Sequence, residues 1–459
     1  MNNNIKKIIE KIKSLSLETI NKNLLLIALI SLVFRHGSFY NSSIPKPFEI
    51  FFVVLFILNG IYLIKNNKIK DFFLSVPKKI LIAIGCLFFS IFIGWAVAIL
   101  FMGMATTIHT FLEFGAFSIG ITMFFLVSFY AKNDQNYGKK YFYALLLPIF
   151  YIIFILYRGT IAGLDSNSLL TFMLNPNVLY KILLIPTFFF ISKLLCELKN
   201  KWMTIGYIII SSLLVAVIFL TASRGGIVSL FSGAIFIWLV FSVHQFNWKK
   251  FFLGGIVVLA ILSFGFLMIP NLSKEAIFNK IFYTASIFND NKIPTITFNT
   301  LNNNNNNKIP TITFNTLNNN NNKKISTITV TTLTQNLPPE ARFIEWPIFF
   351  KYVLVHPFGV GPNSHADFNI VDKNGVHLEF GPNNTYLLIW LWGGLLGIGS
   401  FLYIIWSVFK MLWIKLKNNF NSKSLALLSI LFALSISITF DASLSFYWFF
   451  IILALSLRE

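Results

Sequence analysis

Long apolar runs separated by short polar segments constrain this chain more than any other feature. The runs are about 17–25 residues long, the length that an α-helix needs to cross a hydrocarbon layer of roughly 30 Å at 1.5 Å per residue. Only 12% of the residues are charged and 56% are hydrophobic, whereas about a quarter are charged in an ordinary soluble domain. The sequence therefore predicts an all-α integral membrane protein.

The apolar runs predict about twelve transmembrane helices with one large loop, 270–382, between spans nine and ten. We expect a Lys-rich segment at 1–18, a bundle of about nine spans at 19–269 and a second bundle of about three spans at 383–457. The predicted spans are 19–34, 46–64, 79–102, 106–130, 140–157, 176–195, 203–221, 225–243, 251–269, 383–408, 423–440 and 443–457.

Lysines lie in every second short connection, which predicts the orientation, because short Lys/Arg-rich loops stay in the cytoplasm. Both termini are then cytoplasmic and the long loop is on the outer, non-cytoplasmic side. The net charge of +20 is spread over separate loops, so it does not indicate a nucleic-acid-binding face. Cys86 and Cys196 suggest neither a disulfide nor a zinc site.

The first half of the long loop contains a threefold repeat: NKIPTITFNTL at 291–301, KIPTITFNTL at 308–317 and KISTITVTTL at 324–333, separated by asparagine runs. Such polar tracts lack the apolar content to offset the entropy of ordering. We interpret 286–336 as a variable, mostly disordered insertion with transient hairpins from the alternating TITF and TITV runs. An adhesive or partner-binding β element is the alternative.

The second half of the loop has a different pattern. ARFIEWPIFFKYVLV at 341–355 predicts an amphipathic helix on the membrane surface, with Phe343, Trp346, Phe350 and Val353 on one stripe. The PFGVGPN segment that follows predicts a Pro/Gly turn that leads back toward the bilayer.

Thr221-Ala-Ser-Arg-Gly-Gly226 opens the eighth predicted span and suggests an anion site. Ser223 is a candidate N-cap. Gly225 and Gly226 leave the first-turn amides uncovered, and Arg224 stands beside a helix end that carries about half a positive charge. Alternatively, Arg224 is an interfacial arginine beside a tight turn, and the glycines allow close helix packing.

Polar groups open two other spans on the same face. Asn175-Pro176-Asn177 follows a polar loop that contains Arg158, and Asn383-Asn384-Thr385-Tyr386 opens span ten. Both also fit simple helix starts. Gly393, Gly394 and Gly397 suit a packing face within span ten.

Three further groups have both a functional and a purely structural interpretation. Arg342, close to Glu345 and Trp346, could swing over a bound pyrophosphate or be a solvated surface charge. His109 and Glu113 share a helix face near the outer end of span four, as a functional pair or a structural hydrogen bond. The His and acidic residues of 365–379 match no metal-ligand spacing.

The order of these motifs is more specific than any one of them. The chain resembles the O-antigen ligase and polysaccharide polymerase superfamily in this order: NPN comes first, then SRGG, then a large outer loop. The loop contains R…W…HPF-GVGPN and leads into P-x-N-x-Y-L. The resemblance extends over about 155–400 and is sharpest at 223–226 and 356–387.

The resemblance implies a metal-independent, cofactor-free glycosyltransferase of the bacterial inner membrane. Such enzymes take a glycan from an undecaprenyl-pyrophosphate carrier at the periplasmic face and pass it to an acceptor hydroxyl. A ligase uses a sugar of lipid A core, and a polymerase uses another carrier-linked repeat unit. Carried over by position, Arg224 and Arg342 hold the pyrophosphate, with Arg158 as a third cation. The implied substrate-binding residues are Asn175, Asn177, Ser223, Gly225, Asn384 and Tyr386.

One position departs from the family pattern. Ligases of this type have a histidine, the proposed base for the acceptor hydroxyl, where this chain has Asn383. His377, His365 or Glu379 would have to replace it, or the enzyme relies on positioning and leaving-group stabilisation. We favour a ligase narrowly over a repeat-unit polymerase. A protein O-oligosaccharyltransferase and a transporter are less favoured.

Overall fold

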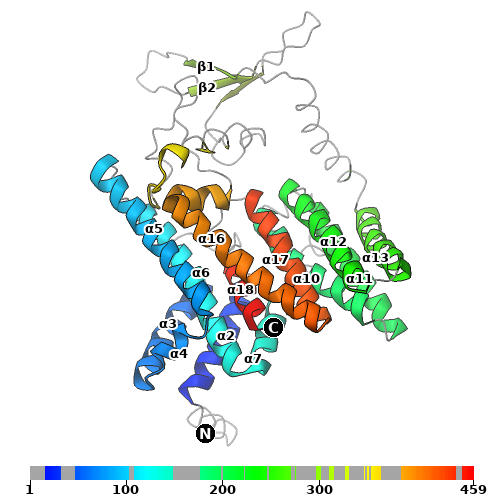
Figure 1. The fold of residues 1–459 in the computed structure, drawn as a ribbon. Coiled ribbons are helices and arrows are strands. Elements are labelled where there is room, and N and C mark those ends of the chain that lie inside the picture. Colours follow the sequence, from blue (N-terminus) through cyan, green and yellow to red (C-terminus); the bar gives the residue numbers. More distant parts are fainter. Residues whose placement is uncertain are drawn as a thin grey trace, which may run out of the picture.

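The fold, taken from a computed structural model, is a helical bundle (Figure 1). The structure describes residues 16–32, 47–102, 108–147, 176–197, 200–221, 223–245, 248–269, 274, 296–300, 310–314, 326–329, 346, 349–350, 353–362, 384–440 and 447–458. The first helices are α2 (Leu17–Ser31), α3 (Pro47–Lys65), α4 (Ile69–Phe73), α5 (Lys78–Met102), α6 (Ile108–Asn133) and α7 (Gln135–Ala144). They are followed by α10 (Pro176–Cys196), α11 (Lys201–Leu220), α12 (Arg224–Gln245), α13 (Trp248–Leu267), α16 (Thr385–Asn418), α17 (Ser422–Ser437), the short 3₁₀ helix η3 (Ile438–Phe440) and α18 (Tyr447–Arg458).

Nine helices in the described part of the chain are long and apolar enough to cross a membrane: α3, α5, α6, α10, α11, α12, α13, α16 and α17 with η3. Each coincides with a predicted span. Helices α2 and α18 are shorter, with 15 and 12 residues, and most of the predicted span 140–157 lies outside the described residues. An integral membrane α protein is thus supported, while the count of twelve stays a prediction.

Helix α16 joins two groups of helices (Figure 1). On one side it packs against α5, and on the other against α17, which in turn contacts α10 and α12. Helix α10 is central, since 89% of its most apolar 18-residue stretch is buried inside the protein. The corresponding share for α13 is 28%. Large apolar side chains exposed on the outer helices, such as Phe56 and Leu259, suit contact with lipid.

One end of the bundle, which we call the basic end, carries lysines in the last turns of α3, α6, α10 and α16. Polar contacts tie its helices together. Lys22 lies 3.0 Å from Glu18 and 3.7 Å from Asp134, and Lys68 donates to the Tyr62 hydroxyl at 2.7 Å. The opposite end, where α10, α12 and α16 begin, is called the site end below.

Helix α16 is broken at Gly394. This residue has φ +62° and ψ −157°, a backbone conformation that is essentially restricted to glycine. The break frees main-chain groups that a continuous helix would pair, and a loop satisfies them. Val360 and Gly361 donate N–H groups to the carbonyls of Leu391 and Trp392 at 2.8 and 3.0 Å, and Leu395 N–H donates to the Pro357 carbonyl at 2.9 Å.

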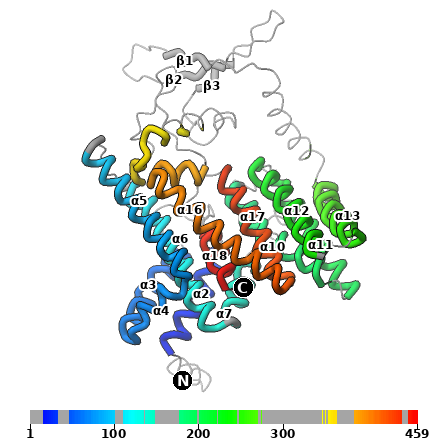
Figure 2. Tube along the Cα trace, viewed as in Figure 1, coloured from blue at the N-terminus to red at the C-terminus, as the bar shows by residue number. Residues whose placement is uncertain are grey.

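The same loop lies tightly against α5 (Figure 2). A Cβ on Gly361 would lie 2.4 Å from the Trp95 Cα atom, and a Cβ on Gly94 would lie 2.3 Å from the Trp392 carbonyl oxygen. The PFGVG segment therefore returns to the bundle, as its Pro/Gly pattern predicts. Gly393 packs on Ser90 of α5 as a small residue should, but Gly394 serves the break and not the packing face.

The asparagine-rich repeat forms one strand per copy. Strands β1 (Ile296–Thr300), β2 (Pro310–Phe314) and β3 (Ser326–Thr329) make an antiparallel sheet in the order β1-β2-β3. Ile296 pairs with Phe314, and Ile312 pairs with Ile328. The alternating TITF and TITV runs thus pair as predicted; whether the whole insertion 286–336 is disordered stays untested.

We expect Gly394→Ala to destabilise the protein by at least ~1–3 kcal/mol, the usual cost of a non-glycine residue in such a conformation. A Cβ there would also lie 2.0 Å from the Pro357 carbonyl oxygen. Thermal unfolding of the purified protein in detergent measures the effect. Gly399→Ala, in the same helix with no atom within 4 Å of its Cβ, is the control and should unfold at or above the wild-type temperature. Equal midpoints for both variants would contradict the broken helix.

Candidate functional site

The N-termini of α10 and α12 meet through a hydrogen bond. Ser223, which immediately precedes α12, donates its hydroxyl to Oδ1 of Asn177 at 3.0 Å. Pro176 is the first residue of α10, as expected for a proline at a helix start. The NPN and SRGG motifs, 46 residues apart at this bond, are therefore parts of one site. The sequence predicted Ser223 as an N-cap; the interhelical bond was not predicted.

The two glycines of SRGG allow close helix packing. A Cβ on Gly226 would lie 2.8 Å from Cγ of Tyr180, and a Cβ on Gly225 would lie 2.8 Å from the Tyr180 hydroxyl and 2.9 Å from Cβ of Phe440. Ser437 in turn donates to the Tyr180 hydroxyl at 3.3 Å. The α12 N-terminus is thus fixed between α10 and η3, and the packing role of the glycines is confirmed.

Arg224 is the first residue of α12 and is half-buried. Its guanidinium therefore belongs to a helix N-terminus, where unpaired N–H groups and the helix dipole favour an anion. Neighbouring Ser223 is only 9% exposed, so the field at this end is less screened than at a fully exposed surface. The arrangement is chemically suited to phosphate or carboxylate groups.

The start of α16 is a capped helix at the same end of the bundle. Asn384 is the N-cap, and its Oδ1 accepts from the N–H groups of Tyr386 at 2.9 Å and Leu387 at 3.2 Å. The Tyr386 hydroxyl donates to the Ser435 carbonyl at 2.8 Å. Both side chains therefore have structural partners, and their proposed roles in substrate binding are not tested by these contacts.

Part of the long loop contacts this end of the bundle. The Trp346 ring lies 6.3 Å, centroid to centroid, from Phe440, the residue that also flanks Gly225. Phe349 and Val353 are each 1% exposed, and they share one helix face. Phe350, which the predicted stripe included, is exposed and meets Trp390 edge-on at 5.4 Å. Trp346 and Val353 thus face the protein as predicted, whereas Phe349 rather than Phe350 is the buried residue between them.

His356 begins the turn that docks into the broken helix. Its carbonyl accepts from Gly359 N–H at 2.9 Å. Burial lowers the pKa of the His356 imidazole below its ordinary value, because a charged ring loses hydration there. Burial therefore favours the neutral form of the ring.

Lys181 is a residue of this end that the motif pattern did not indicate. It is the sixth residue of α10 and has no exposed surface. A lysine within a predicted span is a costly and therefore informative feature, and that signal was present in the sequence. Glu113 of α6, singled out with His109, has a buried Oε2 atom with no hydrogen-bond partner in the described part of the chain.

Several predicted site residues lie outside the described residues: Arg158, Asn175, Arg342, His365, His377, Glu379 and Asn383. The structure therefore brings together Asn177, Ser223 and Gly225 with Arg224 beside them, and places the start of α16 at the same end. The roles of the other predicted residues stay predictions.

Residues 209–402 match the family model described as O-antigen ligase. This match runs from α11 to the middle of α16, and so includes SRGG, the long loop, Asn384, Tyr386 and the break at Gly394. It confirms the predicted resemblance to the O-antigen ligase superfamily. The curated protein sequences contain no match to the chain.

We expect Ser223 and Asn177 to be energetically coupled. A double-mutant cycle of Ser223→Ala and Asn177→Ala, read as the free energy of unfolding in detergent micelles, should give a coupling of about 0.6 kcal/mol, typical of interhelical hydrogen bonds in membranes. Ser232→Ala is the control, because its hydroxyl donates to Val228 within α12; its cycle with Asn177→Ala should show no coupling. Additive effects at 223 and 177 would contradict the bond.

Proposed function

We propose that this chain is a membrane glycosyltransferase of the O-antigen ligase type, which moves a glycan from undecaprenyl pyrophosphate to an acceptor hydroxyl on a lipid A core sugar. The observation that carries the proposal is the meeting of SRGG with NPN at one end of the bundle, within a chain whose residues 209–402 match the O-antigen ligase family. Repeat-unit polymerase is the second candidate, because Asn383 replaces the family histidine.

The orientation is part of the proposal. Lysines mark the basic end in the last turns of α3, α6, α10 and α16, which supports a cytoplasmic position for that end and for both termini. The site end then faces the periplasm of a bacterial inner membrane, where lipid-linked glycans are presented.

The leaving group of this reaction is a pyrophosphate, which needs fixed positive charge. Arg224 at the start of α12 supplies a guanidinium fork and is aided by the helix dipole. Arg342 stands four residues before Trp346, whose ring contacts Phe440, and Phe440 flanks Gly225. The position of Trp346 near the start of α12 supports the choice of Arg342, its near neighbour in sequence, as a second cation for the same pyrophosphate. Lys181 and Arg158 are further candidates at this end.

The reaction itself requires no resident metal. The acceptor oxygen attacks the anomeric carbon, the bond from that carbon to the pyrophosphate oxygen breaks, and undecaprenyl pyrophosphate leaves with the electron pair. The acceptor proton passes to a base, for which His377, His365 and Glu379 are the candidates. Asn383 cannot take this proton, since an amide is not basic at neutral pH. Stabilisation of the leaving group by cations would carry much of the catalysis.

We expect Arg224→Ala and Arg342→Ala each to lower glycan transfer by at least about 100-fold, the usual cost of losing one preorganised charge from a transition state. Arg→Lys at either position should also be impaired, because one ammonium does not reproduce a bidentate fork. Transfer is measured with purified protein, lipid-linked glycan and acceptor in proteoliposomes.

Lys274→Ala is the matched control for these arginine variants. Lys274 follows α13 at the site end, and its ammonium donates to the Leu267 carbonyl at 3.3 Å, so its loss should leave transfer unchanged. Wild-type turnover of both arginine variants would remove the assignment. Solute transport by the reconstituted protein without glycan transfer would favour a transporter instead.

A chromosomal deletion in the native host separates ligase from polymerase. Loss of a ligase should accumulate long carrier-linked polymer with uncapped core, whereas loss of a polymerase should leave core capped with a single repeat unit. Gel analysis of lipopolysaccharide and of carrier-linked glycans distinguishes the two. Unchanged glycolipids together with missing glycoprotein bands would point to protein O-oligosaccharyltransferase.

A further inference from the structure

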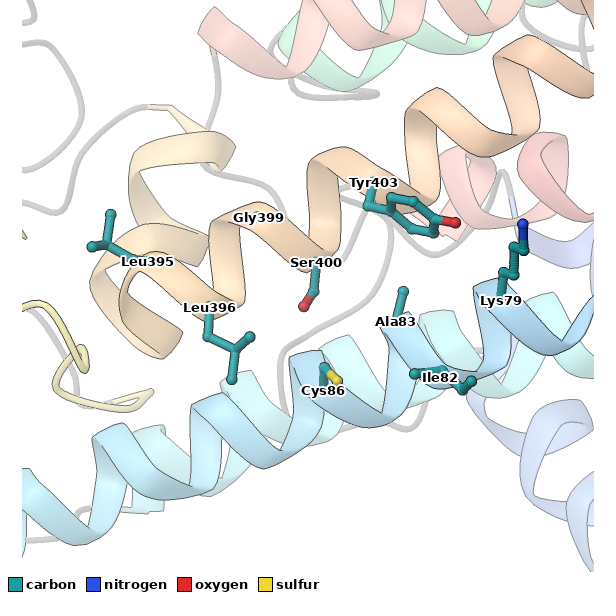
Figure 3. Close-up of a pocket in the computed structure, with 9 residues that line it drawn as sticks. All are labelled: Lys79, Ile82, Ala83, Cys86, Leu395, Leu396, Gly399, Ser400 and Tyr403. Carbon is teal, nitrogen blue, oxygen red and sulfur yellow. The ribbon is translucent and has the colours of Figure 1, made fainter.

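Helices α5 and α16 flank an open groove that the proposed transfer reaction does not use (Figure 3). Its volume is about 510 Å³, within the range of small-molecule sites, roughly 300–1,000 Å³. Its lining residues are Lys79, Ile82, Ala83, Cys86, Leu395, Leu396, Gly399, Ser400 and Tyr403.

The groove lies beside a close contact between the two helices, and small residues line part of it. Next to the break, a Cβ on Gly393 would lie 2.5 Å from the Ser90 hydroxyl, and a Cβ on Gly397 would lie 3.0 Å from it. Two residues further along α16, a Cβ on Gly399 would meet no atom within 4 Å. Ala83 and Ser400, which also line the groove, have small side chains that leave its floor shallowly filled.

The walls and the end of the groove differ in chemistry. Ile82, Leu395 and Leu396 are about half exposed and provide an apolar surface along the groove. Lys79 stands in the first turn of α5, at the basic end, and Figure 3 shows its ammonium beyond the Tyr403 ring, at the opposite end of the groove from Leu395. An apolar channel that ends at a cation at the bilayer edge complements a molecule with an acyl chain and an anionic head.

We propose that the groove between α5 and α16 binds one anionic phospholipid, with an acyl chain along Ile82, Ala83 and Leu396 and its phosphate at Lys79. A lipid chain in the groove would make van der Waals contacts that the small side chains lining it do not make. It would thereby fix the position of α16 on α5 directly below the break at Gly394. The site is structural and distinct from the pyrophosphate site at the other end of the bundle.

The test uses the full-length protein, delipidated in detergent and titrated with phosphatidylglycerol or with phosphatidylcholine of the same acyl chains. Native mass spectrometry counts the bound lipid. We expect one phosphatidylglycerol to be retained in preference to phosphatidylcholine. Gly399→Leu, which places a side chain in the open space of the groove, should abolish this retention. Lys79→Gln should reduce the preference for the anionic lipid roughly fivefold, the effect of about one lysine near a membrane surface.

Two matched variants act as controls. Gly206→Leu also introduces a side chain where nothing lies within 4 Å, but on α11, and Lys201→Gln removes a lysine from the first turn of that helix. Both should bind the lipid as the wild type does. Retention of the phosphatidylglycerol by Gly399→Leu, equal binding of the two lipids, or displacement by undecaprenyl phosphate alone would each overturn the proposal.

Discussion

The break in α16 is the constraint on which the rest of the structure depends. Backbone groups inside a membrane must find partners within the protein, because lipid offers none. At Gly394 the helix leaves the Leu391 and Trp392 carbonyls and the Leu395 N–H without helical partners, and the loop around Pro357 and Gly361 pairs with all three. The long loop is therefore anchored at 357–361 by main-chain hydrogen bonds, and the short first part of α16, with Asn384 and Tyr386, is fixed at the site end.

This anchor holds part of a loop of more than 100 residues (270–382) against the bundle. The segment near Trp346 contacts η3 and the segment near Gly361 contacts α5. These two attachments hold the loop at the end of the bundle where the helices that carry SRGG and NPN begin. A substrate bound at this end would lie beside helix starts against which these two loop segments pack.

Much of the fold could be predicted from the sequence because the length of each apolar run determines whether it forms a membrane-spanning helix. The spans of α3, α5, α6 and α10 to α13 follow from runs of about 20 residues that only a membrane helix can bury. The break could not be predicted, since Gly393 and Gly394 look alike in sequence and only one of them adopts a positive φ. Motif order indicated that NPN and SRGG belong together, but the Ser223–Asn177 bond depends on how α10 and α12 pack. Lys181 was missed because it belongs to no recognisable motif, although a lysine within an apolar run was itself a signal.

The chemistry proposed for the site end depends on a cation that lies beside buried side chains. Ser223 and Tyr180 are buried beside the start of α12, so a guanidinium there acts through a medium that screens it less than water does. A pyrophosphate that departs from a sugar develops its charge at one point, and a cation already fixed at that point needs no reorganisation. The base that takes the proton from the acceptor hydroxyl is then less critical than the cations that hold the leaving group. On this argument, an asparagine at 383 is compatible with transfer, provided that the arginines converge on the α12 end.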